Sequence, residues 1–160
     1  MYKIYMNLQL GLPAPLFSLF DSEKKKVSLS DYKGKRVLIL FFPLAFTSVC
    51  TKELCHVRDN ISIYNNLEIQ TIAISVDSLY TLAQYKKAEN LNFTLLSDFN
   101  KDVSELYGSL YENFSYGMRG VSKRSAFLID TEGVIKYIEV LEDAGLVPDF
   151  QQIKALIQKI

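Results

Sequence analysis

Two continuous apolar runs with a helical pattern between them constrain the fold of this chain more than any other feature. The runs Val37–Phe42 and Ile69–Val76 are β-prone and bounded by turn-forming residues, as is typical of strands covered on both faces. Between them, in the range 48–65, apolar residues recur at steps of three and four, which predicts one helix: Leu54, Val57, Ile61 and Tyr64. A strand, helix, strand order favours a parallel sheet with helices on its faces, and therefore an α/β fold.

The later part of the chain extends this pattern. Residues 78–90 predict a second helix, 94–98 a short strand and 101–108 a short helix. Residues 125–130 and 134–142, joined by the turn sequence TEG, predict a hairpin, so we expect a mixed sheet. Residues 148–160 predict a closing helix with Pro148 in its first turn. The polar stretch 108–124 gives no assignment.

The N-terminal segment LQLGLPAPLFSLF has three turn formers between short apolar pieces, which indicates an N-terminal β-hairpin extension: Gly11, Pro13 and Pro15. No linker, repeat or low-complexity tract interrupts the 160 residues, so we expect a single domain over 1–160. The sequence also lacks the pattern of a targeting segment or of a membrane span, which favours a cytoplasmic location.

The charge balance limits the classes of partner. Eighteen basic residues match eighteen acidic ones, so no net field attracts a phosphate backbone or an anionic membrane. We therefore expect neither nucleic acid nor membrane as a partner.

The two cysteines of the chain, Cys50 and Cys55, are too few for a disulfide scaffold and indicate metal or redox chemistry. Cys50 falls in the first turn of the predicted helix, directly after a central strand, where unpaired N–H groups and the helix dipole favour an anion. Thr47 precedes it by three residues, and its hydroxyl could either cap the helix or lie beside the sulfur.

Helix geometry separates the two thiols. Cys50 shares the apolar stripe of Leu54 and Val57, whereas Cys55 lies about 140° further round the helix. Their Cα atoms would be roughly 8.6 Å apart, beyond the limit of about 7 Å for a disulfide. A static disulfide and a tetrahedral metal site both fit this spacing poorly. A reversible disulfide that needs local unwinding of the helix fits better.

The spacing P-x₃-T-x₂-C, formed by Pro43, Thr47 and Cys50, resembles the active-site signature of the peroxiredoxins, thiol peroxidases on a thioredoxin-like fold. Other segments are similar to family segments and follow the family's order: GLPAP, VSLSDYKGKR, TKEL and RSAFLID. The resemblance spans nearly the whole chain.

The resemblance implies a role for each residue of the site. Cys50 would be the nucleophile that attacks a hydroperoxide, and Thr47 and Arg124 would hydrogen-bond the thiolate and the peroxide. Pro43 would shield the sulfur from water, and Glu53 would orient the arginine. No cofactor is implied. Because complete ionisation of a thiol gains at most about 30-fold at neutral pH, most of the rate gain would come from the arginine and the threonine.

The resemblance also implies a way to recycle the enzyme. The spacing of Cys50 and Cys55 is similar to that of the bacterioferritin-comigratory, Q-type subgroup, in which the second cysteine resolves within the same subunit and a thioredoxin-like dithiol is the reductant. The segment PLAFT is more similar to the alkyl hydroperoxide reductase E-type subgroup, which often works with one cysteine. Members of both kinds occur as monomers and as homodimers.

Three alternatives stay open at this point. The first is a one-cysteine peroxidase that an external thiol resolves. The second is a disulfide reductase or a metal chaperone on the same fold, although the chain has no C-x₂-C motif. In the metal chaperone, His56 would join Cys50 and Cys55 as a ligand. The third is a thiol-based sensor or chaperone, for which the sequence has no positive feature.

Overall fold

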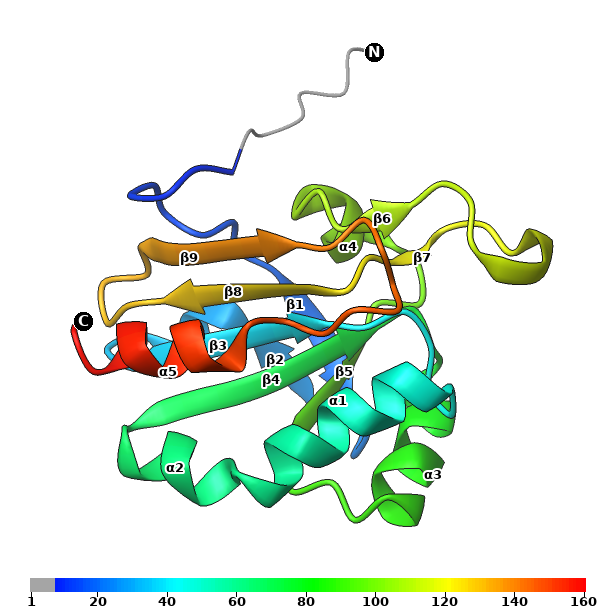
Figure 1. Cartoon of the computed structure of the whole chain (residues 1–160), viewed down its shortest axis with the longest axis horizontal. Coiled ribbons are helices and arrows are strands. Elements are labelled where there is room, and N and C mark those ends of the chain that lie inside the picture. The colour runs from blue at the N-terminus through cyan, green and yellow to red at the C-terminus, as the bar shows by residue number, and fades with distance from the viewer. Residues whose placement is uncertain (1–7) are drawn as a thin grey trace.

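The computed structural model describes residues 8–160, and within them seven strands form one mixed sheet flanked by helices (Figure 1). Its strands are β1 (Ser18–Asp21), β2 (Lys26–Ser28), β3 (Arg36–Phe41), β4 (Ile69–Ser75), β5 (Thr94–Ser97), β8 (Ser125–Ile129) and β9 (Ile135–Val140). The helices are η1 (Leu29–Tyr32), α1 (Ser48–Asp59), α2 (Ile61–Asn66), α3 (Leu79–Ala88), α4 (Asp102–Leu106), η2 (Ser115–Gly117) and α5 (Phe150–Ile157).

The strand order is β2-β1-β5-β4-β3-β8-β9. The central strands β3, β4 and β5 are parallel, because helical crossovers connect them, whereas β8, β9, β1 and β2 add antiparallel pairs at the two sides. The predicted α/β class, the mixed sheet and the β8–β9 hairpin are therefore confirmed.

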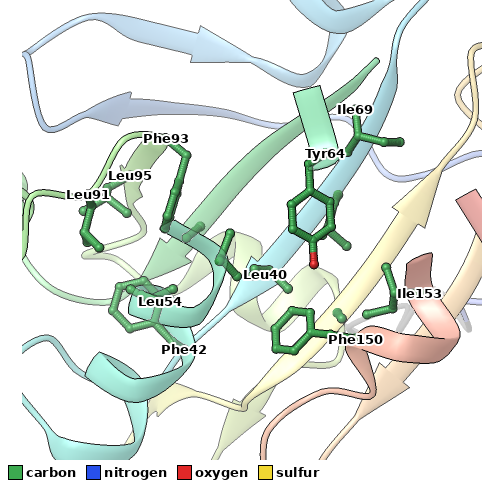
Figure 2. Close-up of a cluster of buried hydrophobic side chains, with 14 of the residues drawn as sticks. Leu40, Phe42, Leu54, Tyr64, Ile69, Leu91, Phe93, Leu95, Phe150 and Ile153 are labelled. Atoms are coloured by element: carbon green, nitrogen blue, oxygen red, sulfur yellow. The ribbon is translucent and has the colours of Figure 1, made fainter. Parts of the chain in front are cut away.

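The apolar run of β3 is continuous because both faces of the sheet are covered. Leu38 and Leu40 belong to the core cluster under α1, α2, α3 and α5, which lie on one face (Figure 1). Ile39 and Phe41 belong to the cluster on the other face, together with residues of η1 and α4. Figure 2 shows the first cluster, in which Leu54 of α1 and side chains of α5 pack over the sheet. Helix α1 is thereby fixed on the face of the sheet to which Leu38 and Leu40 of β3 point.

The predicted helix over 48–65 is interrupted. Helix α1 ends at Asp59 and α2 begins at Ile61, with Asn60 between them at φ −109° and ψ 9°. The Asn60 side chain donates to the carbonyl oxygen of His56 over 2.8 Å, so it competes with the regular helical pairing. The apolar periodicity continues across the break, which is why the pattern predicted one helix.

The N-terminal hairpin lies later in the chain than predicted. Strands β1 and β2 form it around residues 22–25, where Asp21 accepts hydrogen bonds from the N–H groups of Glu23 and Lys25. It pairs with β5 and so extends the main sheet. Of the turn formers predicted to make the hairpin, Gly11 lies in a turn before β1, and Pro13 forms an isolated antiparallel bridge with Val134, the residue before β9. Residues 1–7, where no targeting segment is expected, lie outside the described part of the chain.

Two further assignments differ from the sequence prediction. Asp149 caps α5 by accepting the N–H of Gln152 over 3.0 Å, so Pro148 precedes the cap instead of lying in the first turn. The unassigned stretch 108–124 contains a small antiparallel pair, β6 (Leu110–Tyr111) and β7 (Val121–Ser122). Along residues 8–160, no helix has the length and apolarity that crossing a membrane requires.

Candidate active site

The pairing of β3 with β8 brings distant parts of the sequence to one end of the sheet. Phe41, the last residue of β3, is opposite Ser125, the first residue of β8. Because the two strands are antiparallel, Arg124 therefore lies beside the point where the chain leaves β3 and turns into α1.

The loop between β3 and α1 is held by specific hydrogen bonds. The N–H of Ala45 donates to the Asp77 carboxylate over 2.8 Å, and the hydroxyl of Ser75 donates to the same oxygen. Phe46 adopts a left-handed backbone conformation at φ 65°, which is uncommon for a residue with a side chain. These constraints fix the direction in which the chain enters α1.

Thr47 occupies the N-cap position of α1, but its hydroxyl does not cap the helix. The hydroxyl donates to the carbonyl oxygen of Leu44 over 2.8 Å. The capping alternative is therefore wrong. Thr47 lines the same pocket as Cys50. This agrees with the other role considered for Thr47, a position near the sulfur.

Cys50 and Arg124 form the centre of the site. Cys50 lies in the first turn of α1 and is 1% exposed, as is Arg124. The Nη2 atom of Arg124 donates to the Cys50 sulfur over 3.2 Å, and its Nε donates to the carbonyl oxygen of Ala144 over 3.1 Å. Its Nη1 pairs with a carboxylate oxygen of Glu53, one turn along α1 from Cys50. The guanidinium thus joins the thiol to a buried carboxylate.

Burial has opposite effects on the two charged partners. It raises the pKa of Glu53 to about 7, although the charge of Arg124 and its hydrogen bond work in the opposite direction. For Arg124, burial lowers the pKa, but Glu53 and Cys50 outweigh it and the pKa is raised, so the guanidinium stays charged. Within residues 8–160, the second carboxylate oxygen of Glu53 has no hydrogen-bond partner.

A pocket of about 330 Å³ opens onto Cys50 and Arg124. Its wall comes from the first turn of α1, from the β6–β7 loop and from the loop after β9: Thr47, Ser48, Val49, Phe114, Ser115, Tyr116, Met118, Ala144 and Gly145. The pocket gives a small molecule a path to the sulfur, and its wall is partly apolar.

Cys55 lies on a different side of α1 from Cys50, as predicted. It is partly exposed, and its thiol donates to a carboxylate oxygen of Glu89 over 3.6 Å. Burial raises the pKa of Cys55, Arg58 opposes the rise, and Glu89 adds to it. Both cysteines are free thiols in the structure.

Two further residues considered from the sequence are Pro43 and His56. Pro43 is buried just after β3, and its shielding role stays a prediction. The ring of His56 packs against that of Phe150, with 5.0 Å between the ring centroids. Across residues 8–160, no group of three or more His, Cys, Asp or Glu side chains is placed to hold a metal ion.

Sequence reasoning missed three kinds of contributor. Phe114 and Met118 line the pocket but come from the stretch that received no assignment. Ala144 contributes a carbonyl oxygen, for which only the turn sequence Asp-Ala-Gly gave a signal. Glu89 meets Cys55 from α3, and no sequence signal connects the two positions.

A buried thiol that accepts a hydrogen bond from a buried arginine, at the first turn of a helix after a central strand, defines a thiol-based redox protein. Residues 10–138 match the model of the AhpC/TSA family. Peroxiredoxin Bcp of Escherichia coli is 38% identical over 133 residues, which cover 82% of this chain and 85% of that protein. The chain therefore belongs to the AhpC/TSA family, the peroxiredoxins, which are thiol peroxidases.

Solved structures agree with this assignment. The peroxidoxin BcpB from Mycobacterium tuberculosis superposes with a TM-score of 0.84 at 25% identity, and the match covers 96% of this chain and 99% of that protein's chain. A reduced 2-Cys peroxiredoxin of Plasmodium vivax gives a TM-score of 0.81 at 30% identity and covers 93% of this chain and 80% of its own. The thioredoxin-like fold predicted from the resemblance is thereby confirmed.

Proposed function

We propose that the thiolate of Cys50 reduces hydrogen peroxide and organic hydroperoxides, and that Arg124 and Thr47 assist the reaction. The observation that carries the proposal is the 3.2 Å hydrogen bond from Arg124 to the Cys50 sulfur at the base of an open pocket. A fixed cation beside the sulfur favours the anionic nucleophile and lies where charge develops on the peroxide oxygens.

The first half-reaction transfers one oxygen atom. The Cys50 sulfur attacks the nearer peroxide oxygen, an S–O bond forms, and the O–O bond breaks. The two electrons come from the sulfur, which becomes a sulfenic acid, and the leaving alkoxide or hydroxide takes up a proton. Glu53 acts through Arg124 as a positioning residue, because its carboxylate pairs with Nη1 of the guanidinium while Nη2 donates to the sulfur.

The second half-reaction recycles the enzyme. The Cys55 thiol attacks the sulfenic sulfur, an intramolecular disulfide forms, and water leaves. A thioredoxin-like dithiol then reduces the disulfide by exchange. Because the two thiols lie on different sides of α1, the first turns of this helix must unwind before the bond can form. Recycling by such a donor fits a reducing compartment, and we propose a cytoplasmic location.

A second candidate is a one-cysteine cycle in which an external thiol attacks the sulfenic acid directly. One specific observation favours it: Cys55 is held by Glu89 on another side of an intact helix. The two cycles share the first half-reaction and differ only in which thiol resolves.

One experiment tests both the peroxidase and its cycle. Peroxide consumption is measured for the wild type and for Cys50→Ser, and intact mass is recorded after one equivalent of peroxide and an acid quench. We expect consumption by the wild type only, and a mass loss of about 2 Da that marks the Cys50–Cys55 disulfide. Persistent sulfenic acid, resolved only by added thiol, would establish the one-cysteine cycle. Equal consumption by Cys50→Ser would refute the peroxidase.

A further inference from the structure

Helix α1 is joined to α3 by a row of polar contacts, which we call the α1–α3 seam. The hydroxyl groups of Thr51 and Tyr85 are 3.0 Å apart, and the Cys55 thiol donates to the Glu89 carboxylate over 3.6 Å. Arg58 donates to the main-chain oxygen of Glu89 over 2.6 Å. The α1 residues follow each other at steps of four and three, and the two α3 partners are four apart, so the seam follows one face of each helix.

Glu89 is held firmly at the end of this seam. It is the C-cap residue of α3, and its N–H donates to the carbonyl oxygens of Tyr85 and Lys87. Its own carbonyl oxygen accepts the hydrogen bond from Arg58. The carboxylate therefore meets Cys55 from a fixed backbone, and Arg58, Asp59 and Glu89 are the charged groups that act on the thiol.

We infer that Glu89 is a positioning residue for the second half-reaction: it holds the Cys55 thiol on the α3 side of α1 and thereby delays attack on the Cys50 sulfenic acid. The inference rests on the proposed function, in which Cys55 resolves. It assigns to Glu89 a part in the timing of the cycle.

The chemistry of the resolving step explains the delay. Cys55 must lose its proton, its sulfur must bond to Cys50, and the S–O bond of the sulfenic acid must break, with the hydroxyl group and the proton leaving as water. In the folded state the proton is engaged with a carboxylate, and a neighbouring negative charge opposes thiolate formation. Both effects disappear only when Cys55 leaves Glu89.

Glu89 cannot assist as a base from this position. The sulfur has to leave the α3 side of α1 before it meets Cys50, so proton transfer to Glu89 and bond formation cannot occur in one arrangement. The delay has a consequence for the enzyme, because a sulfenic acid that waits can meet a second peroxide and become a sulfinic acid. Glu89 thus sets the balance between resolution and irreversible oxidation.

The test compares the wild type with Glu89→Gln, which keeps the shape but replaces a charge-assisted hydrogen bond by a weaker neutral one. Both proteins receive one equivalent of peroxide. Samples are quenched with acid at successive times, alkylated and analysed by mass spectrometry. The time course of the conversion of sulfenic acid to disulfide gives the rate. We expect Glu89→Gln to form the disulfide about three to ten times faster and to accumulate less sulfinic acid under excess peroxide.

Three variants separate the role of Glu89 from general loosening. Glu89→Asp keeps the negative charge but draws the carboxylate back by one methylene from a fixed backbone, so its rate should lie between those of the wild type and Glu89→Gln. Asn92→Ala removes the 3.3 Å bond from Asn92 to the Arg58 carbonyl oxygen without touching Cys55, and Glu132→Gln makes the same charge change on the β8–β9 turn. Both controls should resolve at the wild-type rate.

The outcomes are distinct. An unchanged or slower rate in Glu89→Gln, or an equal acceleration by Asn92→Ala, overturns the inference and leaves the proposed cycle intact. A wild type that forms no Cys50–Cys55 disulfide overturns the proposed resolving role itself, and the inference with it. In a Cys50→Ser background, alkylation of Cys55 should also shift to lower pH in Glu89→Gln, because, among the charged groups, only Asp59 then opposes the effect of Arg58 on the thiol.

Discussion

Arg124 donates a hydrogen bond to the sulfur of Cys50 over 3.2 Å, although 74 positions separate the two residues in the chain. The contact exists because β8 pairs antiparallel with β3, so the residue before β8 lies next to the helix that follows β3. A buried guanidinium held by Glu53 and by the carbonyl oxygen of Ala144 has little freedom to move. The sulfur therefore reacts beside a fixed positive charge.

The first prediction concerns Arg124. Ionisation of a thiol accounts for at most about 30-fold at neutral pH, so Arg124→Ala should lower the second-order rate with hydrogen peroxide by more than this factor. Stopped-flow kinetics under single-turnover conditions measures it. The matched control is Arg119→Ala, which removes an exposed arginine of the β6–β7 loop. A loss of less than about 30-fold would place Arg124 outside the transition state.

The second prediction concerns the pH dependence of stability. Burial raises the pKa of Glu53 from its usual 4.5 to about 7, so between these values the folded state holds more protons than the unfolded state. Stability therefore falls as pH rises through this window, by at most about 3 kcal/mol from this group. The amide that replaces the carboxyl group in Glu53→Gln does not titrate. The free energy of unfolding of this variant should therefore not show the decrease between pH 4.5 and about 7 that Glu53 causes.

Urea unfolding of the wild type and of Glu53→Gln at pH 5, 6, 7 and 8 measures the effect. The difference in unfolding free energy between the two proteins should move in favour of Glu53→Gln as pH rises. Glu112→Gln, an exposed carboxylate on the β6–β7 loop, serves as the control and should follow the wild type. A constant difference across the range would contradict the raised pKa.

The third prediction separates the two cysteines. Cys55→Ser should retain a single turnover with peroxide, because the contacts of Cys50 to Arg124 do not involve Cys55. Its steady-state turnover with thioredoxin and thioredoxin reductase should fall at least about tenfold, because the sulfenic acid has no internal partner. NADPH oxidation follows the steady state. Undiminished turnover would show that the resolving thiol comes from outside the chain.

The fourth prediction concerns the hydroxyl of Thr47. It donates to the Leu44 carbonyl oxygen and lines the pocket, so it can accept a hydrogen bond from the peroxide. Thr47→Val should slow the reaction with peroxide about tenfold, which is the usual effect of one lost hydrogen bond, and Thr47→Ser should restore most of the rate. If both variants react alike, the hydroxyl has no part in the step.

Local signals predicted the fold well where burial dominates. The run Val37–Phe42 became β3 and the run Ile69–Val76 became β4, because a strand covered on both faces needs apolar residues on both sides. The break at Asn60 escaped prediction, because a side-chain bond within one turn interrupts the helix without disturbing the apolar period. The β6–β7 loop has no period, so its part in the pocket could not be read from sequence.

The sequence by itself determined strands β3, β4, β5, β8 and β9, the position of Cys50 in the first turn of α1 and, through resemblance, the candidates Thr47 and Arg124. These follow from periodicity and from short spacings, which are properties of neighbouring residues. Only the tertiary structure decided that Arg124 reaches the sulfur, that Glu53 is buried against it and that Glu89 holds Cys55. Strand pairing and helix packing set these contacts, and both depend on residues far apart in the chain.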